Sequence, residues 1–319
     1  MIERDVIRNA PEMFVTVALC SWNRSELLRK TLEQLTLLEP ASGYEWELIV
    51  VDNNSTDETP GVLAEFATRL PLRALREPKP GKSNAANLAV REACGEYILW
   101  TDDDVLVASD WVRQYVGAFL RHPYADVFGG RIDPWFEGTP PRWLAEGFRI
   151  IAGVYAAMDL EWPEGPAPES FYPFGANMAI RRGAHLRHPF DSRIGPQPGS
   201  SIRGEEWMLV RELRRDGAQV VWVPDARVQH FIPRARQSEA YVRDWFYGNG
   251  QLLARIDATE GAGLWFGRPL WLWREWMEYA FRAQFGRFTS PPEKWLKDVS
   301  VSATAWGRLR NYQREVSLP

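Results

Sequence analysis

The sequence predicts an α/β fold, with a mostly parallel central sheet flanked by helices and a helical C-terminal extension. Three observations predict it. Apolar runs alternate with amphipathic helical segments in the first part of the chain, polar clusters follow those runs directly, and the pattern beyond Tyr241 is helical. Apolar strands alternating with helices are typical of a parallel sheet covered on both faces. We therefore expect ligands to bind beyond the carboxyl ends of the strands.

The first half of the chain supplies four strands and three helices in alternation. Strands are predicted from the apolar runs VTVALC at 15–20, ELIVV from Glu47, LRAL from Leu72 and YILW at 97–100. Helices are predicted from Ser25, which is expected to act as the cap, after Asp57, and over about 83–93. Each of the first, second and fourth strands ends in polar residues, so three polar clusters should converge at one edge of the sheet.

The middle of the chain is predicted to add further strands to the sheet. A strand is expected over 126–132, then a long loop or lid over the Pro-, Gly- and Trp-rich stretch 134–173. Further strands follow in NMAIRR, VVWVP and ARVQHF, with a helix opened by Gly204 and stopped by Gly217. We expect two parts, an α/β domain over 13–235 and a helical, Trp- and Arg-rich extension over 236–319.

Charge and composition exclude several classes of protein. The 319 residues are 45% hydrophobic and 25% charged, as in folded globular proteins, and the formal net charge is -4. With this net negative charge the chain shows no excess of basic residues that would bind a nucleic-acid backbone, so no nucleic-acid partner is expected. Residues 1–13 lack the apolar core of a signal peptide, and no long apolar run predicts a membrane span. Cys20 and Cys94 are predicted to be free and buried, and the location to be cytoplasmic.

Three adjacent carboxylates, Asp102, Asp103 and Asp104, directly follow the fourth strand. They would repel one another unless cations or hydrogen-bond donors satisfy them, and Mg²⁺ or Mn²⁺ prefers such oxygen ligands together with substrate phosphates. In an extended segment Asp102 and Asp104 would lie on one side. The alternative is a solvated acidic turn, since Ser109 and Asp110 begin a helix soon afterwards.

Four motifs in order, VTVALCSWNR, LIVVDNNSTDET, PGKSNAANLAV and YILWTDDDV, resemble the donor-binding half of the family 2 glycosyltransferases with a GT-A fold. The segments GANMAIRR, GEEW and ARVQH extend the resemblance to about His230. It implies a metal-dependent, inverting transfer of one sugar from a nucleoside diphosphate sugar, with Mn²⁺ or Mg²⁺ at the DxD motif. The QxxRW motif of processive members is not matched by QSEAYVRDW, so a single transfer is expected.

The resemblance also implies roles on the donor side. Asp52 matches the acid that contacts the nucleotide base, Asn54 lies in the same loop, and Asn23 is assigned to the donor site because it follows the first strand. Asp57, in that loop, is expected to be a helix cap rather than a ligand. Lys82 matches the lysine of the GK pair that faces the diphosphate. The alternative interpretation is that Lys82 is a solvated charge on the surface.

The metal and its neighbours follow from the same comparison. Asp102 matches the residue near the ribose and the metal, Asp104 the direct metal ligand, and Asp103 is assigned to donor binding. His230 matches a histidine that in some relatives completes the metal shell. Its alternative is an ordinary buried histidine with satisfied hydrogen bonds.

On the acceptor side, GEEW matches the family's acid pair. The resemblance implies Glu206 as the general base and Glu205 as the alternative base or its hydrogen-bonding neighbour. Alternatively, both acids only interact favourably with the positive end of the dipole of the helix that they begin. Trp207 is expected to contact the acceptor, because aromatic faces suit the apolar surfaces of sugars.

The tail differs electrostatically from the body. From Ala262 onward the net charge is +4, against -8 for the remainder, and Arg alternates with Trp and Phe. This is the chemistry of a helix at a lipid interface, so peripheral contact with the inner face of the membrane is one expectation. Packing against the body or in a homodimer is the other. Two rival functions stay open, a nucleotidyltransferase that makes a sugar nucleotide and a non-catalytic sugar- or membrane-binding module.

Overall fold

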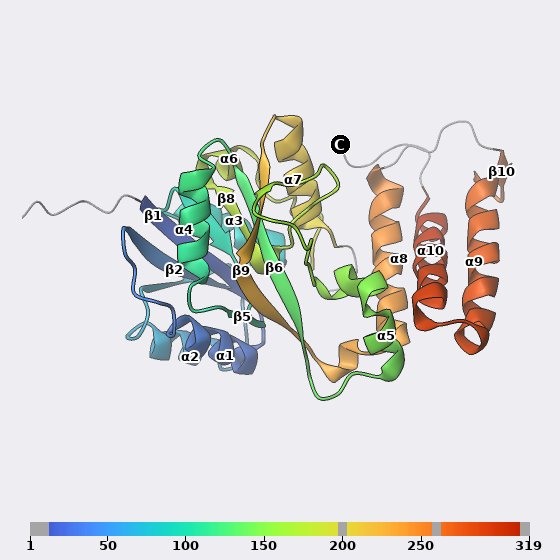
Figure 1. The fold of residues 1–319 in the computed structure, drawn as a ribbon, viewed down its shortest axis with the longest axis horizontal. Coiled ribbons are helices and arrows are strands. Elements are labelled where there is room, and N and C mark those ends of the chain that lie inside the picture. Colours follow the sequence, from blue (N-terminus) through green and yellow to red (C-terminus); the bar gives the residue numbers. More distant parts are fainter. Residues whose placement is uncertain (1–12, 197–202, 257–262, 313–319) are drawn as a thin grey trace, which may run out of the picture.

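The computed structural model describes residues 13–196, 203–256 and 263–312. Its main sheet has nine strands within these ranges, in the order β3-β2-β1-β4-β8-β6-β9-β5, with β7 paired to β9 (Figure 1). The strands are β1 (Met13–Ser21), β2 (Tyr44–Asp52), β3 (Leu72–Arg76), β4 (Tyr97–Trp100), β5 (Val105–Val107), β6 (Val127–Phe136), β7 (Gly165–Pro166), β8 (Met178–Arg181) and β9 (Val220–Ile232). Residues 1–12, used above for the signal-peptide prediction, lie outside the described residues.

The direction of the strands brings three loops to one edge. β1, β2, β3 and β4 are mutually parallel, β8 runs against β4 and β6, and β6 is parallel to β9. In this register Ser21 is the partner of Asp52 and Ala18 is the partner of Trp100. The carboxyl ends of β1, β2 and β4 therefore open at the same edge, as predicted.

Helices cover both faces of the sheet. They are α1 (Ser25–Leu35), α2 (Thr59–Phe66), α3 (Lys82–Glu92), α4 (Trp111–Arg121), α5 (Arg142–Ile151), α6 (Arg182–Arg187), α7 (Glu205–Arg215), α8 (Glu239–Ile256), α9 (Leu270–Thr289) and α10 (Pro292–Arg310). One buried cluster joins the sheet to α1, α2 and α4, and a second joins its other face to α3, α6 and α7. The predicted α/β class with a mostly parallel sheet and a helical C-terminal region is confirmed.

Two predictions for the middle of the chain are wrong. The stretch 134–173 is not a continuous loop, because it contains the ten-residue helix α5, in which Leu144, Gly147 and Ile151 are buried on one face. The runs VVWVP and ARVQHF are not separate strands. They form one strand, β9, which keeps its pairing with β6 on either side of a register shift at Gly130/Arg131.

Two smaller corrections concern single residues. Ser25 is the first residue of α1 and not its cap, since the residue before the helix is Arg24 and the Ser25 N–H is instead bound by the carboxylate of Asp57 at 2.9 Å. Both cysteines are free, as predicted, but Cys94 is exposed and Cys20 half-buried.

The C-terminal helices stand in a row with α10 between α8 and α9 (Figure 1). Close approach of α8 to α10 depends on Gly250 and Gly307, since a Cβ on either would lie within 2.2 Å of the other helix's backbone. A third buried cluster joins these helices to α5 and β9 through residues that include Leu144, Ile232, Val242 and Leu296. No helix in the described ranges is long and apolar enough to cross a membrane.

Candidate functional site

Three of the predicted carboxylates lie at the end of β4, but they face different partners. The carboxylate of Asp103 accepts hydrogen bonds from Ser21 Oγ at 2.8 Å and from Arg24 at 2.9 Å, and Asp104 accepts one from the same Arg24 nitrogen at 3.0 Å. Asp102 instead contacts Lys82. The contacts thus group Asp104 with Asp103 rather than with Asp102, because the segment turns before β5 begins.

Burial and neighbouring positive charges shift the pKa values of Asp103 and Asp104 in opposite directions. Burial raises the pKa of Asp103 to about 6, despite the neighbouring guanidinium of Arg24. Burial would also raise the pKa of Asp104, but His230, Arg24 and Arg236 together hold it well below its usual range. Asp104 is therefore an anion that is only 5% exposed and is offset by cations on two sides.

Strand pairing places His230 beside Asp104. β5 starts directly after Asp104 and runs antiparallel to β9, so Val105 is the partner of His230, and the Phe231 N–H donates to the Asp104 carbonyl at 2.9 Å. His230 Nε2 lies 3.3 Å from Asp104 Oδ1, and Nδ1 lies 2.7 Å from the carbonyl oxygen of Tyr155. Burial alone would lower the pKa of His230, but the carboxylate of Asp104 raises it.

The residues present fit a divalent cation with few protein ligands. The Tyr155 carbonyl holds Nδ1 of His230, so Nε2 is the nitrogen directed at Oδ1 of Asp104, and an imidazole fixed in this way by a carbonyl is the usual arrangement of a metal-binding histidine. Within the described ranges no group of three or more His, Cys, Asp and Glu side chains could hold a metal. A cation here would therefore need oxygens from phosphate or water, as Mg²⁺ commonly does.

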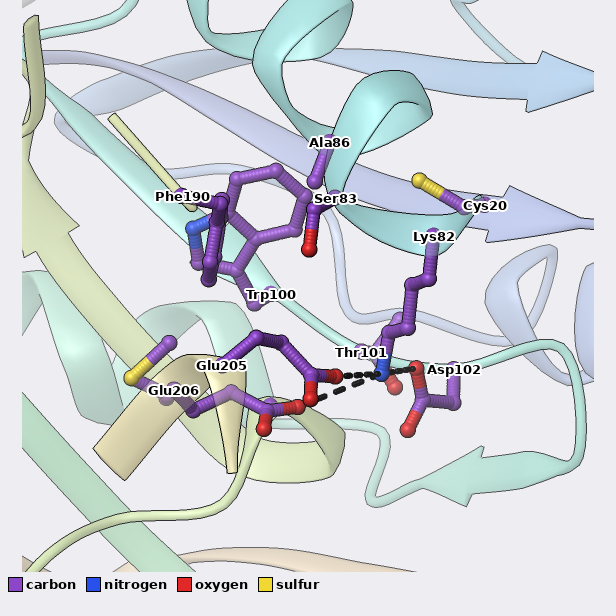
Figure 2. A pocket seen from close by; sticks show the side chains of 12 residues that line it. Cys20, Lys82, Ser83, Ala86, Trp100, Thr101, Asp102, Phe190, Glu205 and Glu206 are labelled. Atoms are coloured by element: carbon purple, nitrogen blue, oxygen red, sulfur yellow. Dashed lines mark hydrogen bonds and ion pairs between the residues drawn. The ribbon is translucent and has the colours of Figure 1, made fainter. Parts of the chain in front are cut away.

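Lys82 connects the acids after β4 to the acids that begin α7. It is the first residue of α3, and its Nζ lies 3.0 Å from Asp102 Oδ1 and 3.2 Å from Glu206 Oε1 (Figure 2). Burial alone would lower the pKa of Lys82, but Asp102, Glu206 and Glu205 raise it well above its ordinary value. Lys82 is therefore not the solvated surface charge that was its alternative, since its side chain is only 28% exposed.

The two glutamates begin α7, after Gly204 at φ +102°. Burial, followed by repulsion from Glu206, raises the pKa of Glu205 to about 8. Glu205 is 4% exposed, whereas the side chain of Glu206 is 17% exposed and so is the more accessible acid.

Two glycines, one that begins a short helical turn and one in a loop, leave the space that both glutamates occupy. A Cβ on Gly175 would lie 2.6 Å from Glu206 Oε1, and a Cβ on Gly195 would lie 3.3 Å from the carboxyl carbon of Glu205. Lys82, Asp102 and the two glutamates line a pocket of about 10 Å³, room for roughly one water.

The loop after β2 is held by its own hydrogen bonds. Asp52 is buried and accepts from the Ser55 N–H at 2.8 Å, and Asn54, at φ +66°, accepts from Arg76 at 2.8 Å. Asn23 is exposed and accepts from the Thr56 N–H at 2.8 Å, which ties the loop after β1 to the loop after β2. These three predicted donor residues lie at the expected edge, but the hydrogen bonds described here do not join them to Lys82 or to the acids after β4.

Asp57 acts as the cap that was predicted. Its carboxylate accepts from the N–H groups of Ser25 and Thr59, at 2.9 and 3.1 Å, and so serves the starts of both α1 and α2. Partial burial would raise the pKa of Asp57, but the hydroxyl of Thr59, which donates to the carboxylate at 2.6 Å, and these two N–H groups lower it to about 2.

Trp207 lies on α7 one residue beyond Glu206. Its ring is 5.5 Å from that of Tyr172 and 5.3 Å from the guanidinium of Arg211, and it packs against a small buried cluster with Ile194 and Leu252. Packing, its alternative role, thus accounts for part of the ring, and acceptor contact stays a prediction.

Sequence reasoning missed two residues of this site. Arg24 contacts Asp103 and Asp104, and Tyr155 supplies the carbonyl that orients His230. Arg236, in the segment after His230, approaches Asp104 at 3.7 Å. A signal existed for Arg24, which closes the SWNR motif beside Asn23. Tyr155 carried none, because only its backbone takes part.

Comparisons with known proteins agree with this geometry. Residues 16–185 match the sequence profile described as Glycosyl transferase family 2. The succinoglycan biosynthesis protein ExoM of Rhizobium meliloti (strain 1021) is 23% identical to this chain over 257 residues, which cover 79% of this chain and 78% of ExoM.

Two solved structures share the fold. The mannosyltransferase PcManGT of Pyrobaculum calidifontis, in complex with GDP-Man and Mn²⁺, aligns with a TM-score of 0.61 at 19% identity, over 94% of this chain and 89% of that one. Residues 1–349 of Staphylococcus aureus TarS, in complex with UDP-GlcNAc, align with a TM-score of 0.55 at 16% identity, over 86% and 73%. At these identities the likeness establishes the fold alone.

Proposed function

The chain belongs to glycosyl transferase family 2 and is a glycosyltransferase, and from this we propose that it moves one sugar, with inversion and with a divalent metal, from a nucleoside diphosphate sugar to a hydroxyl acceptor. The acceptor is a glycan, a lipid-linked sugar or a small molecule. The family assignment favours this reaction over a nucleotidyltransferase and over a non-catalytic sugar- or membrane-binding module.

The observation that carries the proposal is the position of Lys82. Its ammonium group contacts Asp102, from the loop after β4, and Glu206, from the start of α7, at 3.0 and 3.2 Å. Asp102 and Glu206, 104 positions apart in sequence, thus meet at one cation. A transferase needs this convergence, because the donor phosphates and the acceptor hydroxyl must approach the same anomeric carbon.

On the donor side, we assign the diphosphate to Lys82 and to the start of α3. A cation and the positive end of a helix dipole both favour a bound anion at this point. Asp104 and His230 would hold Mn²⁺ or Mg²⁺, with Asp102 nearby, and the bound ion would neutralise charge on the diphosphate as it leaves. That PcManGT binds GDP-Man together with Mn²⁺ supports this assignment.

The remaining donor assignments concern the nucleoside. We propose that Asp52, Asn54 and Asn23 line its base and that Asp103 acts through Arg24, because the carboxylate of Asp103 is turned onto that side chain and onto Ser21. Asp103 would then fix Arg24 beside Asp104 rather than touch the donor itself.

On the acceptor side, we assign Glu206 as the general base. Its carboxylate takes the proton of the acceptor hydroxyl as that oxygen bonds to the anomeric carbon, and the bond from the anomeric carbon to the diphosphate oxygen breaks. The nucleoside diphosphate leaves with the bonding electrons, so the configuration inverts and no covalent sugar–enzyme intermediate forms. Glu206 suits this role better than Glu205, because Glu205 is almost fully buried and its pKa of about 8 keeps it protonated at neutral pH.

The test is the substitution Glu206→Gln, with release of nucleoside diphosphate measured over a panel of donors and acceptors. Removing a general base costs about 10²- to 10⁴-fold in rate, while donor affinity should stay within a few-fold of the wild-type value. The matched control is Glu212→Gln on the same helix, whose carboxylate contacts Arg211 and Arg215. A near-normal rate for Glu206→Gln would move the base elsewhere.

Predictions about partners complete the proposal. We propose a cytoplasmic enzyme without a nucleic-acid partner, whose domain of residues 13–235 carries the reaction and whose extension of residues 236–319 supplies contacts to a membrane or to a second copy. The exposed surface of that extension distinguishes between these two partners.

A further inference from the structure

Exposed apolar side chains are concentrated in one short segment of the C-terminal extension. Nine large hydrophobic residues between Leu264 and Phe288 are at least 37% exposed, whereas the exposed ones elsewhere in the described chain are scattered singly. They are Leu264, Trp265, Phe266, Leu270, Trp271, Met277, Phe281, Phe285 and Phe288. Contiguous exposed apolar surface on a folded protein marks an interaction site, while single exposed residues do not.

On α9 these residues form a stripe along one side of the helix. Leu270, Met277, Phe281, Phe285 and Phe288 recur at spacings of seven, four, four and three, which place them on one face. The residues of α9 that are buried, Leu272, Ala283 and Gly286, lie on the opposite face, toward α10. α9 is also the outermost helix of the row (Figure 1). The stripe is therefore turned away from the protein.

A small hairpin continues the apolar surface at the start of α9. It pairs β10 (Leu264–Trp265) with β11 (Arg268–Pro269), and its two turn residues, Phe266 and Gly267, have φ of +49° and +73°. A phenylalanine at positive φ is strained, yet this one is 76% exposed, with its ring 4.8 Å from that of the neighbouring Trp265. Trp265 stacks edge-on against Trp273 of α9 at 5.2 Å, which fixes the hairpin to the helix.

Charge distinguishes the possible occupants of this surface. Arg274 falls within the stripe and Arg268 lies in the hairpin, and neither has an ion-pair or hydrogen-bond partner for its guanidinium in the part of the chain that the structure describes. A second copy seated on the stripe would bury Arg274 in an apolar interface. A lipid surface instead offers phosphates to the guanidinium groups and acyl chains to the rings.

We propose that the stripe of α9 and the β10–β11 hairpin, together the aromatic face, bind the surface of an anionic lipid bilayer, with α9 lying in the plane of the interface. The phenylalanine rings enter the boundary of the acyl chains, and Arg268 and Arg274 contact lipid phosphates. Binding of this kind does not depend on the proposed transfer reaction.

The test is flotation of the full-length protein with vesicles of phosphatidylcholine alone or with phosphatidylglycerol added. Wild type should float with the anionic vesicles and less with the neutral ones, and added salt should weaken binding. The variant Arg268→Gln/Arg274→Gln should lower the partition coefficient about 30-fold, since each surface cation contributes about fivefold. Phe281→Ser/Phe285→Ser/Phe288→Ser should lower it at least about tenfold.

The matched control is Leu37→Ser/Leu120→Ser, which removes two exposed apolar residues outside the aromatic face and should leave partitioning unchanged. The thermal midpoint of each variant verifies that it is folded. Failure of wild type to bind anionic vesicles, or equal binding by the phenylalanine and control variants, would overturn the proposal. The oligomeric state, measured by light scattering, gives a further test. A wild-type dimer that becomes a monomer in the phenylalanine variant alone would also overturn the proposal.

Discussion

Lys82 determines the electrostatics of the site at the scale of single residues. Its ammonium group faces Asp102, Glu206 and Glu205, the last at 3.8 Å, and so offsets acids that would otherwise repel one another. A donor diphosphate would compete with Glu206 for the same cation. Binding of the donor would thereby release the carboxylate of Glu206 for the acceptor, which connects the two halves of the reaction.

Asp57 provides a prediction for stability. Its pKa of about 2 is below the 3.8 of an unfolded aspartate, so its contribution is present in full above about pH 4 and is lost as the pH falls toward 2. Asp57→Ala should lower the free energy of unfolding at pH 7 by about 1 kcal/mol, the value of a helix cap. The measurement is urea unfolding at pH 7 and pH 3.

At pH 3 the difference between Asp57→Ala and wild type should be smaller than at pH 7. Glu45→Ala is the control, because Glu45 is an exposed acid in β2 and does not lie at the start of a helix. A loss of stability that is equal at the two pH values would show that Asp57 does not act through its charged form.

Residue roles could be predicted from sequence where the partner is local or part of a motif. Asp57 was predicted as a cap from its own NSTDET segment, which contains its partner Thr59, whereas its contact with Ser25, 32 positions away, was not predicted. Lys82 and Glu206 were assigned from motifs. Arg24 was missed because its partners, Asp103 and Asp104, lie about 80 positions away. Proximity of that kind depends on the order of the strands, which local patterns do not contain.

At the scale of elements, two features were not predictable from local pattern. β5 is only three residues long, yet its pairing with β9 is what brings His230 to Asp104. α5 was predicted as loop because prolines and glycines surround it, but its apolar face packs onto α10, whose Leu296 would be 2.2 Å from a Cβ on Gly147. In both cases contacts between elements distant in sequence, rather than the local sequence, determine the structure.

The short helical turn η2 (Gly175–Asn177) controls the space available to Glu206. Gly175→Ala would place a Cβ 2.6 Å from Glu206 Oε1, and the carboxylate, as the far end of a flexible side chain, would yield rather than the backbone. We expect the transfer rate to fall by about 10²-fold, the effect of displacing a catalytic group by about 1 Å. The thermal midpoint should change little.

Gly183→Ala is the matched control, since a Cβ there meets nothing within 4 Å. Measured under the same conditions, it should keep the wild-type rate. Full activity of Gly175→Ala would mean that the position of Glu206 does not limit transfer.

At the scale of the whole molecule, the two predicted parts are joined rather than separate. The extension shares a buried cluster with α5 and β9, and Tyr155 in that cluster also supplies the carbonyl that orients His230. The body carries a net charge of -8 and the tail +4, so an anionic surface would attract the tail and repel the body. The molecule would then meet a bilayer by its extension.

The measurement that tests the central claim most directly is calorimetric titration of nucleoside diphosphate sugars, with and without Mn²⁺, into wild type and Asp104→Asn. Asparagine keeps the size of the buried side chain and removes its charge. We predict that at least one donor binds wild type in the presence of Mn²⁺, and that either removing the metal or substituting Asp104 weakens this binding by tenfold or more. Binding of the same donor that neither change weakens would contradict the account.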